Sequence, residues 1–209
     1  MNNKLGSAVL IGYGSVGLRH AALLDVRYAA LSIVDSNPTA RQQASADYPS
    51  ATIASSLADL DRTNWDWAGT IAVIATWGPS HADIFHDLAR LDVRHILCEK
   101  PIAHSVKAGV TMVKTAKTLG ISMGVNHHMR YSSFSSGLNA LAEEFGLGEP
   151  CSMFVHGGAN GLVTRGIHQI DLACQIFGQG PESVVSTVVG APINPRSPNL
   201  MFYGGTAAW

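Results

Sequence analysis

The residues with the clearest chemical meaning are three glycines, Gly12, Gly14 and Gly17, which form the pattern G-x-G-x-x-G. They follow an apolar run at 8–11 that predicts a buried strand, and they precede a segment with helical apolar spacing. There the first glycine permits a tight turn, the second lets a diphosphate approach the backbone, and the third lets helix and strand pack closely. The helix start then faces the diphosphate. The predicted dinucleotide-binding loop is Gly12, Tyr13, Gly14, Ser15, Val16 and Gly17.

Asp35 supports this prediction, because it ends a second apolar run about twenty residues further along the chain. A carboxylate in that place accepts hydrogen bonds from the adenosine ribose and repels the 2′-phosphate of NADP. NAD is therefore the expected cofactor, and Ser36, Asn37 and Arg41 nearby keep NADP as the alternative. The other interpretation of Asp35 is a helix cap before Pro38.

Glu99-Lys100-Pro101 directly follows the predicted strand 95–98 and also carries possible chemistry. Strand ends of a doubly wound sheet point into the ligand crevice, so Lys100 is expected beside a nicotinamide. A partly desolvated lysine near a cofactor cation has a lowered pKa, suited to holding or removing a hydroxyl proton. Pro101 restricts Lys100 to extended backbone. Glu99 is expected to position Lys100 or the ribose; the alternative is a surface Lys100 paired with Glu99.

His168 lies near the start of an amphipathic stripe at 167–177, and Asp171 follows three residues later on the same helical face. An imidazole held by a carboxylate is a workable acid or base near neutral pH. The alternative is a helix-start histidine that caps or packs.

Strand and helix patterns alternate around these residues as far as residue 125. This alternation predicts an α/β fold with a doubly wound parallel sheet over residues 1–125. The helices between the strands include one from Pro38 to about Tyr48 and one from Ser105, its cap, to Leu119. The expected strands are residues 8–11, 31–34, 51–54, 70–75, 95–98 and 121–125.

After residue 125 the pattern changes to a polar segment and then to helices and strands that no longer alternate. Residues 126–209 are therefore expected to form a partial α+β substrate domain. The expected elements there are helices up to about 145 and over 167–177, strands at 152–156, 183–189 and 200–203, and a loop at 157–161.

Composition narrows the function classes. The chain has 209 residues, is 46% hydrophobic, and carries a net charge of −1 without a basic cluster. This balance permits a real core and argues against nucleic acid as the main partner. Neither a signal peptide nor an apolar run of membrane-spanning length is found in the sequence. The three widely spaced cysteines predict neither a disulfide framework nor a zinc site, so a reducing cytoplasm is expected.

Four stretches together resemble the glucose–fructose oxidoreductase and inositol dehydrogenase family (Gfo/Idh/MocA), in the right order and over almost the whole chain. They are the glycine pattern at 12–17, Ile74-Ala75-Thr76 with His81, Cys98-Glu99-Lys100-Pro101, and residues 166–171. The resemblance implies an N-terminal Rossmann domain and a C-terminal α/β domain with a large open sheet. It also implies hydride transfer between a nicotinamide cofactor and a sugar, cyclitol or related polyol.

The resemblance further implies roles for single residues. Lys100 and His168 become the catalytic candidates. Besides the glycine loop and Asp35, the implied cofactor-binding residues are Thr76, Trp77, His81, Glu99 and Lys100. The implied substrate-binding residues are Lys100, Asn126, Arg130, Thr164, Arg165, His168 and Asp171. His81 also fits a helix cap and Trp77 a core residue. Because His127 and His128 are adjacent and point to opposite sides in extended chain, no metal site is expected.

Two features depart from the family pattern. Thr164 stands where many members carry an aspartate, so the substrate or the proton relay is expected to differ. Arg165 beside it fits an acidic substrate, such as a uronate or nucleotide sugar, or equally a surface arginine. The segment after residue 152 is also too short for the family's C-terminal sheet, which predicts a shortened chain or a fragment. Its open sheet edge is expected to pair in a homo-oligomer.

The leading interpretation is an NAD-dependent dehydrogenase or reductase whose small-molecule substrate is a sugar, a polyol or a related carbonyl compound. The alternative is a non-catalytic nucleotide-binding module with a sensor or regulatory role. The presence of both Lys100 and His168 favours the enzyme, whereas Thr164 and the short length favour the binding module.

Overall fold

The structure, a computed structural model, describes residues 4–60, 65–156, 165–193 and 202–208. It divides into two compact units, Met1–Asn126 and His127–Trp209, and each is treated separately below.

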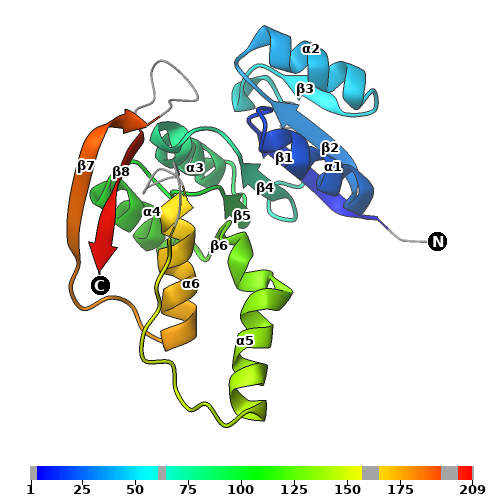
Figure 1. The fold of residues 1–209 in the computed structure, drawn as a ribbon. Helices are drawn as coiled ribbons and strands as arrows, with labels where there is room; N and C mark the ends of the chain where they lie inside the picture. Colours follow the sequence, from blue (N-terminus) through cyan, green and yellow to red (C-terminus); the bar gives the residue numbers. More distant parts are fainter. Residues whose placement is uncertain (1–3, 61–64, 157–164, 194–201, 209) are drawn as a thin grey trace. The chain divides into compact units, whose positions relative to one another are not determined.

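The first unit is built on one parallel sheet of six strands in the order β3-β2-β1-β4-β5-β6 (Figure 1). Every neighbouring pair is parallel, which requires a crossover between consecutive strands. This order confirms the predicted doubly wound fold and puts the point of reversal between β1 and β4, where ligands bind. The strands are β1 (Leu5–Ile11), β2 (Tyr28–Val34), β3 (Thr52–Ala54), β4 (Ile71–Ile74), β5 (His95–Cys98) and β6 (Ser122–Val125).

Four of the crossovers contain an α-helix, and two of these helices, α2 and α4, begin at a side-chain cap that the sequence supplies. Asn37 accepts the N–H of Thr39 at the start of α2, and Ser105 accepts that of Ala108 at the start of α4. Gly120 ends α4 in the left-handed conformation, with φ of 66°. The helices are α1 (Gly17–Arg27), α2 (Pro38–Asp47), α3 (His81–Arg90) and α4 (Val106–Leu119), with 3-10 turns η1 (Leu57–Asp59) and η2 (Gly78–Ser80).

Side chains of β1 alternate between two apolar cores, one for each group of helices. Leu10 belongs to the core that contains Ala21 and Leu24 of α1, whereas Val9 belongs to the core that contains Phe85 of α3. Both neighbours in β1 are fully buried, so the sheet is covered on its two faces. The carboxyl ends of the strands, together with the loops that follow them, are left to form the site.

The second unit contains helices and an antiparallel strand pair. Its elements are η3 (His128–Tyr131), α5 (Ser133–Glu144), α6 (Ile167–Phe177), β7 (Val185–Ile193) and β8 (Phe202–Ala208). β7 and β8 pair from Val185 opposite Ala208 to Ile193 opposite Phe202. The helix predicted at 167–177 is confirmed, and Gly178 ends it with φ of 70°.

The strand predicted at 152–156 is wrong. These residues have no regular secondary structure, and Phe154 is 84% exposed. Alternating side chains stabilise a strand only when a partner supplies backbone hydrogen bonds and a covered face, and this segment has no strand partner among the described residues. The predicted loop at 157–161 lies outside the described residues.

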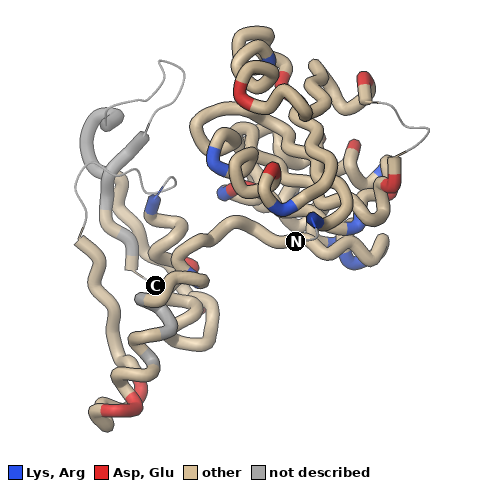
Figure 2. Tube along the Cα trace, turned by 90° about the vertical axis from the view of Figure 1, so that its right-hand side faces the viewer, with Lys and Arg blue, Asp and Glu red and all other residues tan. Residues whose placement is uncertain are grey.

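Charges of both signs are interspersed along the first unit (Figure 2). The longest helix there, α4, has only 14 residues. Within the described parts of the chain, no helix has the length and apolar character needed to cross a membrane.

Candidate functional site

The glycine loop after β1 has the geometry that each glycine was expected to provide. Gly12 has φ of 97°, and a Cβ added to it would lie 2.8 Å from the carbonyl carbon of Ala75. A Cβ on Gly17 would lie 2.0 Å from the carbonyl oxygen of Gly12, so only glycine lets α1 start this close to the turn. Gly14 has nothing within 4 Å of its added Cβ. The loop is therefore closed towards the protein at Gly12 and Gly17, and open to a ligand at Gly14.

These contacts predict that two loop variants fail in different ways. Gly17→Ala forces a methyl group against a backbone oxygen and should lower the free energy of unfolding by about 1–3 kcal/mol. Gly14→Ala meets no protein atom, so its melting temperature should stay near wild type while NADH affinity falls. Thermal unfolding and NADH fluorescence titration measure the two effects. The control is Gly6→Ala, another open position, which should change neither. A Gly17→Ala protein as stable as wild type would contradict the packing argument.

Asp35 lies beside this loop with its carboxylate already oriented. Oδ2 accepts the N–H of Tyr13 at 2.7 Å, and Oδ1 accepts the N–H of Asn37 at 2.8 Å. Arg41 donates from Nη1 to the carbonyl oxygens of Asp35 and Ser36, both at 2.8 Å. The side chain that caps α2 is that of Asn37, so the capping alternative for Asp35 does not hold. A carboxylate keeps further acceptor capacity after two hydrogen bonds, which suits ribose hydroxyls.

The side chain of Tyr13 points away from the loop and supports it from behind. It is 4% exposed, and its hydroxyl donates to Oδ2 of Asp47 on α2 at 2.7 Å. Burial, and then the bond to Asp47, raise the pKa of Tyr13 well above its usual value. Of the residues predicted to bind a cofactor, Tyr13 therefore offers backbone atoms only.

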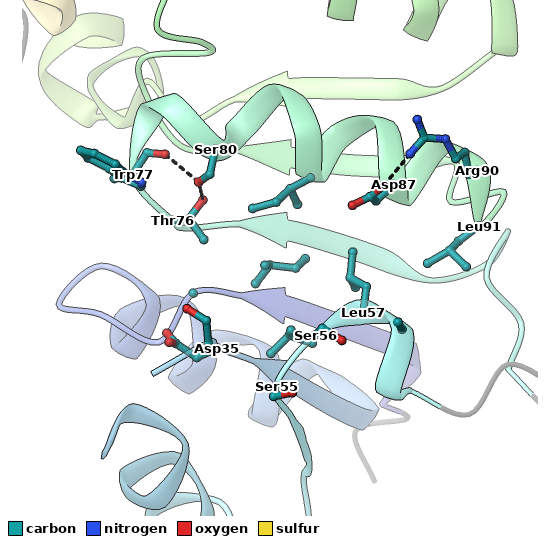
Figure 3. A pocket seen from close by; sticks show the side chains of 16 residues that line it. Asp35, Ser55, Ser56, Leu57, Thr76, Trp77, Ser80, Asp87, Arg90 and Leu91 are labelled. Carbon is teal, nitrogen blue, oxygen red and sulfur yellow. Dashed lines mark hydrogen bonds and ion pairs between the residues drawn. The ribbon is translucent and has the colours of Figure 1, made fainter. Parts of the chain in front are cut away.

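A cavity of about 560 Å³ opens at the carboxyl ends of β1, β2 and β4 (Figure 3). Asp35 lies on one side with residues 55–58, and α3 closes the other side. Thr76 and Trp77 stand at one end, and Ser80 donates to Oγ1 of Thr76 at 2.8 Å. A smaller hollow of about 350 Å³ is lined by the loop residues Gly14, Ser15 and Val16 and again by Asp35, Thr76 and Trp77.

Several lining residues were not identified from the sequence. For Trp77, the structure also decides between a cavity-lining and a core position. The indole of Trp77 is 58% exposed, so it is not a core residue. Ser55 and Ser56 directly follow β3, and the rule that strand ends face the crevice could have identified them. The α3 residues carried no such signal, because only the crossing of α3 over the sheet brings them there. The lining residues missed include Ser55, Ser56, Leu57, Ala58, Ser80, Ile84, Asp87, Arg90 and Leu91.

Glu99 is buried at the end of β5, 6% exposed, and it bonds to three groups. Oε1 lies 2.8 Å from Nε2 of His20 and accepts the amide of Asn126 at 2.6 Å. Oε2 accepts the N–H of Lys100 at 3.3 Å. Glu99 is therefore not part of a surface ion pair, and Asn126, predicted at the substrate, donates to this carboxylate. His20 was not predicted as a site residue.

His81 joins the loop that follows β4 to the loop that follows β5. It is fully buried at the start of α3, with Nδ1 2.9 Å from the carbonyl oxygen of Pro101 and Nε2 3.1 Å from that of Thr76. The loops also meet at Gly78, where an added Cβ would lie 3.3 Å from Cγ of Pro101. The imidazole therefore braces the loop that carries Lys100 instead of lining the cavity.

In the second unit, His168 lies among other imidazoles instead of pairing with Asp171. Its ring packs edge-on at 5.4 Å from that of His127 and at 4.7 Å from that of His128. His168 is buried in the first turn of α6. Both neighbours reach it because η3 bends the chain at His128, so the prediction that they point to opposite sides of an extended segment is wrong. Across the described residues, no group of three or more histidine, cysteine or acidic side chains is arranged to hold a metal ion.

Asp171 binds a residue that the sequence analysis had placed at the substrate. Nε of Arg130 donates to both carboxylate oxygens of Asp171 at 2.8 Å. The predicted pairing of Asp171 with His168 is therefore wrong. Asp171 pairs with Arg130 instead, because η3 packs against α6 and brings the guanidinium to it. Arg165 is exposed just before α6, and Thr164 lies outside the described residues.

Comparisons with known proteins agree with this geometry. The sequence model described as "Oxidoreductase family, NAD-binding Rossmann fold" (GFO_IDH_MocA) matches residues 7–127. The chain is 26% identical to scyllo-inositol 2-dehydrogenase (NADP(+)) IolW of Bacillus subtilis, over 90% of this chain and 56% of that protein.

Two solved structures illustrate the fold. One is scyllo-inositol dehydrogenase of Lactobacillus casei with bound NAD(H) and scyllo-inositol, at a TM-score of 0.73, 14% identity, and coverage of 93% of this chain and 62% of that one. The other is the WlbA dehydrogenase of Bordetella pertussis with NADH and UDP-GlcNAcA, at a TM-score of 0.70, 24% identity, and coverage of 90% and 60%. The chain thus spans little more than half the length of these relatives.

Proposed function

The chain belongs to the Gfo/Idh/MocA family of oxidoreductases, and from this premise we propose that it transfers a hydride between a nicotinamide dinucleotide and a hydroxyl or carbonyl of a small molecule. The observation that carries the proposal is the glycine loop: open at Gly14, closed at Gly12 and Gly17, and adjoining a cavity of about 560 Å³. The proposed substrate class is a sugar, cyclitol or sugar derivative, since both inositol dehydrogenases named above act on a cyclitol.

The residues around the cavity fit a dinucleotide. The open backbone at Gly14 and the start of α1 receive the diphosphate, because helix-start N–H groups favour anions. Asp35 binds the adenosine ribose, and the space between residues 55–58 and α3 takes the base. Trp77 stands at the opposite end of the cavity with its indole exposed. When bound, the nicotinamide accepts or donates the hydride.

The proton that accompanies the hydride needs a protein group. We assign this role to Lys100, which is half-buried at the end of β5 with its backbone held by Glu99 and by the brace of His81 on Pro101. Lys100 holds or removes the hydroxyl proton during oxidation and returns it during reduction. His168 is the second proposed acid or base, because an unperturbed imidazole is the side chain whose ordinary pKa lies nearest neutral pH.

Cofactor preference follows from Asp35. NAD(H) should bind more tightly than NADP(H), because the 2′-phosphate meets a carboxylate that Tyr13 and Asn37 hold in place. Asp35→Ala should reduce the difference by about tenfold, the value of one charge-assisted hydrogen bond. Arg41, already turned towards this corner, then faces the phosphate. Fluorescence titration with NADH and NADPH measures this, with Asp83→Ala as an exposed control. Equal affinities for the two cofactors in the unaltered protein would overturn the assignment.

We also propose that the protein forms a homo-oligomer and works in a reducing cytoplasm. A homo-oligomer through the β7–β8 pair is supported by exposed apolar side chains on β7, where Val185 is 72% and Val188 60% exposed. A reducing cytoplasm is supported by three free cysteines, Cys98, Cys151 and Cys174.

A substrate panel separates the enzyme from the non-catalytic binding module. The protein is incubated with NAD and, in turn, neutral sugars, cyclitols, uronates and nucleotide sugars, and NADH absorbance is followed. Turnover with at least one class supports the oxidoreductase. Tight NADH binding without turnover on any class supports the binding module instead.

A further inference from the structure

Glu99 is an unusual side chain to find buried at this position. A carboxylate removed from water is costly unless charged or hydrogen-bonding partners replace the water. At 6% exposure, Glu99 receives such partners from three separate parts of the first unit: His20 in α1, Asn126 after β6, and the N–H of its neighbour Lys100.

The protonation state of Glu99 determines the direction of these hydrogen bonds. Burial raises the pKa of Glu99, but the bonds from His20 and Asn126 outweigh it and lower the pKa to about 2. The carboxylate is therefore ionised at neutral pH and can only accept. It follows that Nε2 of His20, 2.8 Å away, carries a hydrogen and donates it.

His20 connects two parts of the proposed site that are far apart in sequence. It lies in the first turns of α1, the helix whose Leu18 N–H bonds the carbonyl oxygen of Gly14 in the diphosphate loop. Glu99 is 79 residues away and directly precedes Lys100. On the far side, the N–H of Asn126 bonds the carbonyl oxygen of Cys98, so the strand end before Glu99 is also fixed. The bond from His20 to Glu99 thus links the helix after the glycine loop to the residue that precedes Lys100.

We propose that His20 is a positioning residue for Lys100: its Nε2 fixes the carboxylate of Glu99, which in turn holds the backbone N–H of Lys100. The role in catalysis rests on the proposed function, whereas the effect on the environment of Lys100 does not. Without His20, Oε1 of Glu99 keeps only the bond from Asn126, and we expect the carboxylate to turn towards the ε-amino group of Lys100. An opposite charge nearby raises the pKa of a lysine, so its amine becomes less nucleophilic at neutral pH.

The test compares two substitutions of His20 in the full chain. His20→Gln keeps an N–H donor, whereas His20→Leu keeps bulk and loses the donor. The matched control is His95→Leu, an exposed histidine at the amino end of the same strand, β5. Trace acetylation of Lys100 is measured against pH by mass spectrometry of its peptide, which requires no turnover. NADH binding and the melting temperature are recorded for each protein.

The expected result is that His20→Leu moves the midpoint of Lys100 acetylation upward by about one pH unit, which is about a tenfold loss of reactive amine at a fixed lower pH. His20→Gln and His95→Leu should follow the wild-type profile. If the protein also turns over, His20→Leu should lower kcat with little change in KM for NAD.

Three outcomes overturn the proposal. One is a wild-type acetylation profile for His20→Leu. Another is an altered profile that His20→Gln shares, since restoring the donor then restores nothing. If His20→Leu does not fold, His20→Asn replaces it, because the shorter amide cannot reach Glu99. The third outcome is a wild-type acetylation profile for His20→Asn. Absence of NAD turnover in every protein affects the proposed function alone, because acetylation still reports on Lys100.

Discussion

Lys100→Ala is expected to lower kcat by about 10²–10⁴-fold, the usual contribution of a positioned acid or base. NADH affinity should change by less than a few fold, because the cavity that would hold the adenosine half is lined by other residues. The methyl group of alanine cannot hold the hydroxyl proton as hydride leaves. Steady-state kinetics with saturating NAD, together with NADH titration, separate these two quantities.

The control for this prediction is Lys107→Ala, which replaces an exposed lysine in the first turn of α4. It should match wild type in both measurements. Near-normal turnover by Lys100→Ala would remove this lysine from the mechanism. A large loss of NADH affinity with unchanged kcat would assign it to cofactor binding only.

Turnover should also fall by about 10²–10⁴-fold when His168 is replaced, again with NADH binding retained. His168 is buried beside the rings of His127 and His128, so alanine would leave a gap as well as remove the imidazole. His168→Gln is therefore measured beside His168→Ala, because glutamine fills most of the space without titrating. Both should lose activity, and only His168→Ala should lose much thermal stability.

An exposed histidine of the same unit, His156, provides the control, and His156→Ala should behave as wild type. Undiminished activity in His168→Gln would show that the imidazole only packs. Asp171 binds Arg130 and not His168. The effect of replacing His168 on turnover should therefore not depend on the carboxylate at residue 171.

The fold of the first unit could be predicted because its signals are local. Parallel strands are buried on both faces and appear as apolar runs, so the strand 95–98 agrees with β5 residue for residue. Ser105 and Gly120 marked the ends of α4 for the same reason: caps act within one turn. The glycine loop was recognisable because Gly12 and Gly17 each have a local steric reason to be glycine.

What the sequence could not predict depends on distant partners. The bond between His20 and Glu99 joins residues 79 positions apart, and that between Arg130 and Asp171 joins residues 41 apart. No local pattern encodes either pair. The strand predicted at 152–156 was wrong for the opposite reason. The local alternation was present, but a strand also needs a neighbouring strand.

The central claim is that hydride passes directly between a substrate carbon and the nicotinamide. It is tested most directly with the substrate of the panel on which the protein is most active, deuterated at its carbinol carbons, and by mass spectrometry of the NADH formed. Direct transfer predicts NADH carrying one deuterium, and a large loss of product with Lys100→Ala. NADH without deuterium, or no NADH from any member of the panel despite tight cofactor binding, would contradict the claim.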